Sequence, residues 1–173
     1  MAKCRRGDGQ GALGGDQIGK NPTDRAKNGS KRSLIVDGQG GPLGVVVAGA
    51  NVHDTKLLEA TIEAMVIDRP EPDEEEQHLC LDKGYDNPTG HAAALNAEYV
   101  PHIRRIGEEK LDHQNKKTRP ARRWVVERTF AWLNHCRAIL VRYNKKASNY
   151  LGLIQLACIL LWYRRAWRLD NLR

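Results

Sequence analysis

The 173-residue sequence has only four cysteines, and none of them lies close enough to another to form a zinc-binding pattern. Their placement also lacks the framework of a disulfide-rich secreted domain, so free thiols are predicted. The first residues are glycine-rich and basic, without the apolar core of a secretory signal. The strongest membrane candidate, residues 151–163, is shorter than the ~20 residues of a transmembrane helix and contains Gln155. A cytoplasmic protein with no membrane partner is expected.

Charge is distributed unevenly along the chain. Residues 101–173 hold 17 Lys and Arg against 5 Asp and Glu, whereas residues 1–100 hold 11 against 16. The net charge is +7. A basic C-terminal part favours a phosphate-bearing partner or an anionic surface, although a generally basic soluble protein would have the same composition. The length is sufficient for one domain with a core of its own.

Residues 1–33 contain little apolar material and most of the early glycines, so they are predicted to form a loop. The segment is basic, with eight Lys and Arg against three Asp. It is compatible with two roles, a loop that approaches a phosphate backbone and a disordered leader. We therefore divide the chain into a leader or loop over residues 1–33 and a folded domain over residues 34–173.

Hydrophobic periodicity predicts the elements of the folded domain. β-branched residues on both sides of a Gly-rich turn predict a hairpin, and apolar residues at helical spacing predict helices. Strands are expected at 33–37, 43–49, 78–82 and 99–103, and helices at 55–67, 89–97, 122–134 and 148–167. The nearly continuous apolar character of the first two strands indicates that both of their faces are covered.

Three polar residues in the first half of the chain have two interpretations each. Asp37 ends a strand, where it can point into a site or begin the turn. His53 and Asp54 precede the helix at 55–67, where they can be metal ligands, or Asp54 can cap the helix while His53 makes local hydrogen bonds. We expect the turn and the cap.

Asp82 is a better site candidate than any acid before it. It follows a short apolar strand, and groups just past the carboxyl end of a strand commonly line the ligand crevice in sheets flanked by helices. Gly84, in the turn after it, permits close backbone approach.

Glu127 is the one acid in the basic helix predicted at 122–134. Arg123 and Ala131 share its side of that helix, because residues four apart are neighbours on a helix surface. The small side chain of Ala131 leaves room beside the carboxylate. Two interpretations follow, a surface ion pair between Glu127 and Arg123 and a carboxylate that binds a metal ion in a polyanion site.

The helix at 148–167 is apolar on nearly all sides, so it is expected to be buried or packed against a partner. Its end combines Arg164, Arg165 and Arg168 with Trp167. That combination is compatible with nucleic-acid binding. It is equally compatible with the favourable effect of the helix dipole on basic residues at a helix C-terminus.

Asp82 and Glu127 are 45 positions apart, so only the fold can join them. The chemistry that uses such a pair is metal-assisted phosphoryl transfer, in which two divalent ions ~4 Å apart activate the attacking oxygen and stabilise the leaving one. Mg²⁺ prefers carboxylate oxygens as ligands. Basic residues around the acids would then hold the phosphate backbone.

Three blocks of the sequence resemble the DDE transposases of bacterial insertion sequences, which have an RNase H-like catalytic domain. The blocks lie at 21–60, 79–87 and 122–150 and contain the segments NPTDRAKNGSKRSLIVDGQGG, LCLDKGYDN and RRWVVERTF. The resemblance runs from about residue 11 to residue 168. It implies a mixed sheet with flanking helices, and cut-and-join chemistry on element ends. It places the family's second catalytic acid on Asp82, its third on Glu127, and a basic residue on Arg123.

The sequence departs from the family pattern at its N-terminus. The family's first catalytic Asp lies on a hydrophobic strand before the Gly-rich loop, whereas this chain begins MAKCRRGDGQGALGG. Asp8 is the only acid near that place, and its neighbours are glycines, which are depleted in strands. The family signature also often has Tyr at the position of Pro120 and Lys at that of Asn134. The expected fold is α/β, an RNase H-like mixed sheet flanked by helices that lacks the first catalytic strand.

The resemblance implies a DNA transposase that uses Mg²⁺ or Mn²⁺, held by Asp82 and Glu127, to cleave and join strands at insertion-sequence ends. Its partners would be element-end and target DNA, on which a homo-oligomer assembles in the bacterial nucleoid. The residues expected to contact DNA are Lys27, Lys31, Arg32, Lys83, Arg122, Arg123 and Arg128. Two alternatives stay open. One is a catalytically inactive, truncated remnant that only binds DNA or a full-length transposase, and the other is a structural or RNA-binding basic module.

Overall fold

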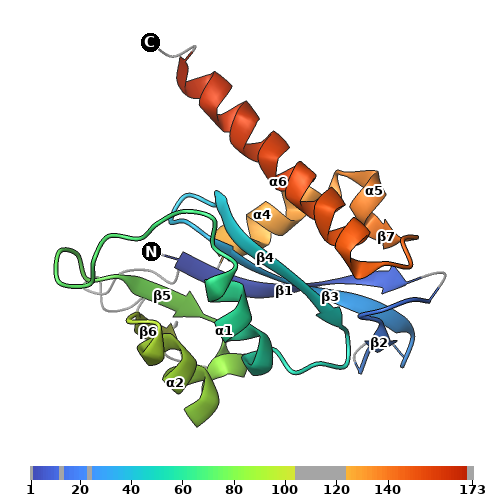
Figure 1. The fold of residues 1–173 in the computed structure, drawn as a ribbon, viewed down its shortest axis with the longest axis horizontal. Helices are drawn as coiled ribbons and strands as arrows, with labels where there is room; N and C mark the ends of the chain where they lie inside the picture. The colour runs from blue at the N-terminus through green and yellow to red at the C-terminus, as the bar shows by residue number, and fades with distance from the viewer. Residues whose placement is uncertain (1, 12–13, 23–24, 104–123, 171–173) are drawn as a thin grey trace, which may run out of the picture.

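The computed structural model describes the backbone of residues 2–11, 14–22, 25–103 and 124–170, and the side chains of these residues apart from 2–11, 169 and 170. In this part of the chain one seven-stranded mixed sheet carries helices on both faces (Figure 1). The strands are β1 (Ala2–Gly11), β2 (Gly19–Lys20), β3 (Asn28–Val36), β4 (Pro42–Gly49), β5 (His78–Leu81), β6 (Val100–Ile103) and β7 (Val141–Arg142). The helices are α1 (Thr55–Glu63), the 3-10 helix η1 (Lys83–Tyr85), α2 (Pro88–Asn96), α4 (Trp124–Asn134), α5 (Arg137–Leu140) and α6 (Ala147–Asp170).

β1 lies in the middle of the sheet. It pairs antiparallel with β3, with Lys3 opposite Val36, and parallel with β5, with Lys3 opposite Cys80. β4 extends the sheet beyond β3 and β6 extends it beyond β5, so the main strand order is β4-β3-β1-β5-β6. β2 adds a short ladder to β3, and β7 adds one to β1. The mixed sheet with flanking helices that the resemblance implied is confirmed.

The expectation that the first strand is missing is wrong. Residues 2–11, predicted as part of a loop or leader, form the central strand β1, and β3 runs across the expected boundary at residue 33. The glycines and basic residues of this segment gave no strand signal. Strand propensity, however, depends mainly on context. A strand with a partner on each side gains main-chain hydrogen bonds along both edges, whatever its side chains are.

Successive side chains of β3 point to opposite faces of the sheet, and each face carries its own part of the hydrophobic core. Ile35 packs on the side of α1 and α2, whereas Leu34 and Val36 pack on the side of α4, α5 and α6. All three side chains are fully buried. The prediction that this strand is covered on both faces is therefore confirmed.

The predicted cap of α1 is wrong in its details. Asp54 occupies the N-cap position, but its side chain makes no capping hydrogen bond. Its Oδ1 lies instead 2.8 Å from Nζ of Lys31 on β3. His53 makes the expected local contact, with Nδ1 2.8 Å from Oγ1 of Thr55. The carboxylate of Asp54 thus pairs with a buried lysine of the sheet and does not cap the helix.

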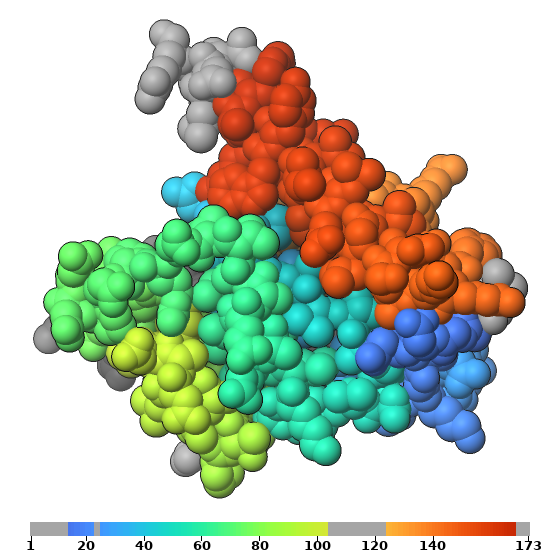
Figure 2. Space-filling model, viewed as in Figure 1, coloured from blue at the N-terminus to red at the C-terminus, as the bar shows by residue number. Residues whose placement is uncertain are grey.

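α6 is longer and less buried than predicted. Tyr150 and Ile154 are fully buried against the sheet, but Ile159, Tyr163 and Trp167 are 60–67% exposed. Figure 2 shows the last described turns of α6 projecting from the body of the molecule, beyond the turn that joins β3 to β4. Of the two expectations for this helix, burial within the chain is wrong for this half, because α6 continues past β4, α4 and α5, the elements it packs on, whereas packing against a partner stays a prediction. Among the described helices, none is long and apolar enough to cross a membrane.

A buried arginine fixes the start of α6. Arg142 is 1% exposed, and its guanidinium donates to Ser30 Oγ at 2.6 Å and to the carbonyl oxygen of Lys145 at 3.0 Å. Asp16 lies beside it, with Oδ1 3.4 Å from Nη2. The same Oδ1 accepts the backbone N–H of Ala147, the first residue of α6, at 2.8 Å. These contacts tie the helix to the loop before β2 and to β3.

Replacing Asp16 by asparagine is expected to reduce the acid sensitivity of unfolding. The hydrogen bond from the backbone N–H of Ala147 holds the pKa of Asp16 below its ordinary value of 3.8. Because the folded-state pKa is below the unfolded value, the contribution of the carboxylate is complete above the unfolded pKa and is lost as the pH falls through the folded pKa. Urea unfolding should show a gap between the parent and Asp16→Asn at neutral pH that is smaller at a pH below 3.8. A gap of the same size at both pH values would contradict this role.

Candidate functional site

Asp82 lies directly after β5, where the backbone is still extended, with φ −74° and ψ 160°. Its Oδ1 accepts the backbone N–H of Lys83 at 2.8 Å, and its side chain is half-buried. Leu79 and Leu81 pack in the core beside α1 and α2. Because side chains alternate along a strand, Asp82 lies on the opposite face of the sheet, the face that α4 covers. Its predicted place at the carboxyl end of a strand is confirmed.

Glu127 is exposed on one flank of α4. Val126 and Phe130 face the core, whereas Arg128 and Trp132 face a groove beside α6. With 3.6 residues per turn, successive residues are about 100° apart around the helix axis. Glu127 therefore falls on a different flank from the groove.

The strand order directs the flank of α4 that carries Glu127 toward the strand that Asp82 follows. α6 packs over β4, and α4 packs over β3 and β1. In the order β4-β3-β1-β5, the flank of α4 that is turned away from α6 is turned toward β5, and Asp82 follows β5. An assignment of both acids to one metal site requires this placement.

The neighbouring position on β1 is not an acid. Cys80 pairs with Lys3, and continuing this parallel register places Asp82 beside Arg5. Asp8 lies three residues farther along β1, a distance of roughly 10 Å at ~3.3 Å per residue. Among the side chains that the structure describes, no three from His, Cys, Asp or Glu come together as a metal site.

Two of the predicted DNA contacts are buried. Lys31 and Arg32 are each 2% exposed. Lys31 pairs with Asp54, and Nη2 of Arg32 donates to Oδ1 of Asn134 at 3.0 Å. Side chains enclosed in this way cannot reach a phosphate backbone, so the burial of Lys31 and Arg32 does not fit the expected contact with DNA.

The other predicted DNA contacts differ in position. Lys27 and Lys83 are exposed, and Lys83 is next to Asp82. Arg128 is half-buried on the groove side of α4. Arg122 and Arg123 lie outside the described residues. Lys83 is therefore the predicted contact that the sequence places nearest to Asp82.

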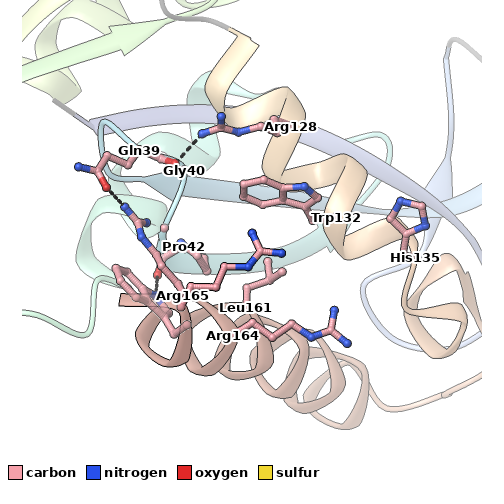
Figure 3. A pocket seen from close by; sticks show the side chains of 12 residues that line it. Gln39, Gly40, Pro42, Arg128, Trp132, His135, Leu161, Arg164 and Arg165 are labelled. Carbon is pink, nitrogen blue, oxygen red and sulfur yellow. Dashed lines mark hydrogen bonds between the residues drawn. The ribbon is translucent and has the colours of Figure 1, made fainter. Parts of the chain in front are cut away.

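A groove of about 600 Å³ lies between α4, α6 and the turn that joins β3 to β4 (Figure 3). Its lining residues fall in three segments, 39–42, 128–135 and 161–168, and we call it the C-terminal groove. The sequence drew attention to the arginines at the end of α6. The groove itself was not predicted, because the turn at 39–42 is more than 80 positions from both helices that complete its walls.

The turn at the bottom of the groove is held by Asp37. Its Oδ1 accepts the backbone N–H groups of Gln39 at 2.8 Å and Gly41 at 2.7 Å, which confirms its expected role in the turn. Its Oδ2 lies 3.3 Å from Nη1 of Arg165. Asp37 thus connects the turn to α6.

Both helices of the groove are also attached to the turn. Trp162 Nε1 donates to the carbonyl oxygen of Pro42 at 2.8 Å, and Arg128 Nη2 donates to that of Gln39 at 2.6 Å. A Cβ atom on Gly41 would lie 2.4 Å from the ring of Trp162, so glycine is needed for this close approach. The groove is therefore a fixed feature of the fold.

The thiol of Cys158 has no reactive character. Burial raises its pKa to about 11, and Cys136 nearby acts in the same direction. At neutral pH the thiol stays protonated, and nucleophilic chemistry requires the thiolate. This residue belongs to the packing of α6.

Comparison with known proteins finds transposases, the family that the three sequence blocks resemble. A family model described as the transposase DDE domain matches residues 3–162. A protein described as a transposase for the insertion sequence element IS402, from Burkholderia cepacia, is 33% identical over 161 residues, which are 91% of this chain and 74% of that protein. The piggyBac transposase in a synaptic complex with hairpin DNA matches with a TM-score of 0.46 and 11% identity, over 91% of this chain. This chain spans 45% of the piggyBac chain.

Proposed function

The chain belongs to the transposase DDE domain family, and we propose that it cleaves and joins DNA strands at insertion-sequence ends by metal-dependent phosphoryl transfer. We further propose that the fold is RNase H-like, with antiparallel pairing through β4, β3 and β1 and parallel pairing through β1, β5 and β6. The proposal is supported by the strand order β4-β3-β1-β5, in which the flank of α4 that carries Glu127 is turned toward β5 and Asp82.

The donor set fits Mg²⁺ or Mn²⁺. Hard divalent ions prefer carboxylate oxygens. Asp82 uses one oxygen on the N–H of Lys83, which leaves its second oxygen available within the described chain. A bound ion would activate the attacking oxygen and stabilise the leaving one. The ammonium group of Lys83, exposed beside Asp82, would hold a neighbouring phosphate.

The partners in this proposal are element-end and target DNA, on which several copies of the chain assemble in the nucleoid. The exposed apolar residues of α6, among them Ile159 and Tyr163, offer a surface for that assembly. Obligate contacts between protein copies are typically rich in such side chains.

One observation favours a second function, that of a catalytically inactive remnant. Arg5, a basic residue, occupies the level of Asp82 on β1. A site with Asp82 and Glu127 alone would bind metal weakly, and the chain would then act as a DNA-binding remnant or as a partner of a full-length transposase. An assay of strand breakage distinguishes the two functions, because only an active transposase cuts DNA.

The test is a strand-cleavage and strand-transfer assay on duplex DNA from the two flanks of the gene that encodes this chain. The parent should act only with Mg²⁺ or Mn²⁺. Asp82→Asn and Glu127→Gln should each lower the rate about 100- to 1,000-fold, because a catalytic metal supplies several kcal/mol and each 1.36 kcal/mol is tenfold. Glu59→Gln, an exposed acid on α1 across the sheet, is the matched control. A Glu127→Gln chain as active as the parent would refute the assignment, and a parent that binds DNA without breaking it would establish the remnant.

A further inference from the structure

We propose that the C-terminal groove binds an unpaired stretch of DNA, one or two nucleotides long, at a place separate from Asp82 and Glu127. The inference rests on the proposed function only in taking DNA as the ligand. Glu127 and the groove lie on different flanks of α4, about 100° apart around the helix axis between Glu127 and Arg128.

The groove carries positive charge that the described protein leaves uncompensated. Arg164 and Arg168, one turn apart on α6, are exposed and make no hydrogen bond or ion pair with any described residue. Its described lining contains no Asp or Glu. Guanidinium groups bind phosphates through paired N–H donors, so two of them one turn apart suit successive phosphates of a strand.

Aromatic faces favour a single strand over a duplex. Trp132 and Trp162 both line the groove and are each 39% exposed. Arg128 lies over the ring of Trp132 at 4.8 Å, and Arg165 lies over that of Trp162 at 5.0 Å. In a duplex the base faces cover one another, whereas an unpaired base can stack on an aromatic ring beside basic groups.

The size and rigidity of the groove agree with this ligand. A volume of about 600 Å³ lies in the range of sites for small organic molecules, so it accommodates one or two nucleotides and excludes a double helix. The turn at 39–42 joins both helices through Trp162 and Arg128. A preformed site loses less entropy when it binds.

An acidic peptide would satisfy the arginines equally well. The exposed acidic segment 71–76 of a second copy of this chain is one such peptide. It would leave the face of Trp132 without a stacking partner, so the aromatic lining favours a nucleotide.

The experiment measures binding of a fluorescein-labelled oligothymidylate and of a hairpin duplex to the full chain by anisotropy, between about 50 and 200 mM salt. Trp132→Ala should weaken binding of the single strand about tenfold without changing its salt dependence, because stacking involves no counterion. Arg164→Ala/Arg168→Ala should lower the slope of log Kd against log salt by about 1.4, since each phosphate contact contributes about 0.7 on a single strand. Duplex binding should change less in both variants.

Lys20→Ala/Lys56→Ala, which removes two exposed charges elsewhere, is the matched control and should leave the single-strand slope unchanged. Circular dichroism of each variant should retain the helical signal of the parent. If the groove variants bind the oligothymidylate as the parent does, or if they lose duplex binding equally, the inference is overturned. It is also overturned if a synthetic peptide of residues 69–77 binds through Arg164 and Arg168 while the oligothymidylate does not. Asp82→Asn should bind the oligothymidylate normally, so failure of strand transfer and failure of this inference are distinguishable.

Discussion

Replacing Arg142 by methionine is expected to lower the free energy of unfolding by about 3–5 kcal/mol. The guanidinium group is buried and donates to Ser30 Oγ and to the carbonyl oxygens of Gln17 and Lys145. Methionine has a similar length but no donor, so these hydrogen bonds are lost, although Ser30 Oγ still donates to the carbonyl oxygen of Gln17 and the backbone N–H of Asp16 to that of Lys145. A hydrogen bond from a charged group contributes about 1.5–3 kcal/mol. The value should be read from urea unfolding followed by circular dichroism at neutral pH.

Arg137→Met on α5 is the control for this experiment, because Arg137 is exposed and the substitution is chemically identical. A surface change of this kind should alter the free energy of unfolding by less than about 0.5 kcal/mol. Equal effects of the two substitutions would show that the buried hydrogen bonds of Arg142 do not hold the start of α6.

The second large effect is expected at Ile154. Its side chain is 0% exposed and packs with Leu34, Phe130 and Tyr150 in the core beneath α6. Ile154→Ala removes buried methylene and methyl groups and leaves a cavity, so the free energy of unfolding should fall by about 2–5 kcal/mol. The same urea titration measures it.

Ile159→Ala, five positions farther along the same helix, is the matched comparison. Ile159 is 62% exposed, so its truncation should change the stability of the monomer by less than about 0.5 kcal/mol. Comparable losses at the two positions would mean that the outer face of α6 is covered in solution. Repeating the titration at two protein concentrations would then test whether a second copy covers it, because stability through association depends on concentration.

Local sequence patterns were sufficient to predict the secondary-structure elements next to Asp82 and around Glu127. Asp82 follows an alternating apolar strand, and Glu127 lies in a helix with a clear apolar stripe, so their elements were predicted correctly. Their common side of the sheet depends on strand order. That order was not predicted, since pattern and propensity carry no information about which strands are neighbours; only the family resemblance implied that the two acids belong to one site.

β1 and the C-terminal groove show what local patterns cannot give. The segment of β1 has the composition of a loop, and it is a strand because β3 and β5 flank it. Lys31 and Arg32 were expected on the surface because they are charged. The same central sheet buries them, and Asp54 and Asn134 supply their partners. The groove requires Gly41 and Trp162 to meet, and these residues are 121 positions apart.

The central place of β1 has a consequence for folding during synthesis. β1 is followed soon by β3, which pairs with one of its edges, but the partners of its other edge appear much later, since Ala2 pairs with Leu79 and Gln10 with Val141. At 5–20 residues per second, ribosomes need roughly 10 s to make the intervening chain up to β7. Until β5 is made, β3 can pair with only one edge of β1, and the other edge stays unpaired; the end of that edge at Gln10 then waits for β7. Unpaired strand edges promote aggregation, so the nascent chain should depend on chaperones in this interval more than the finished domain does.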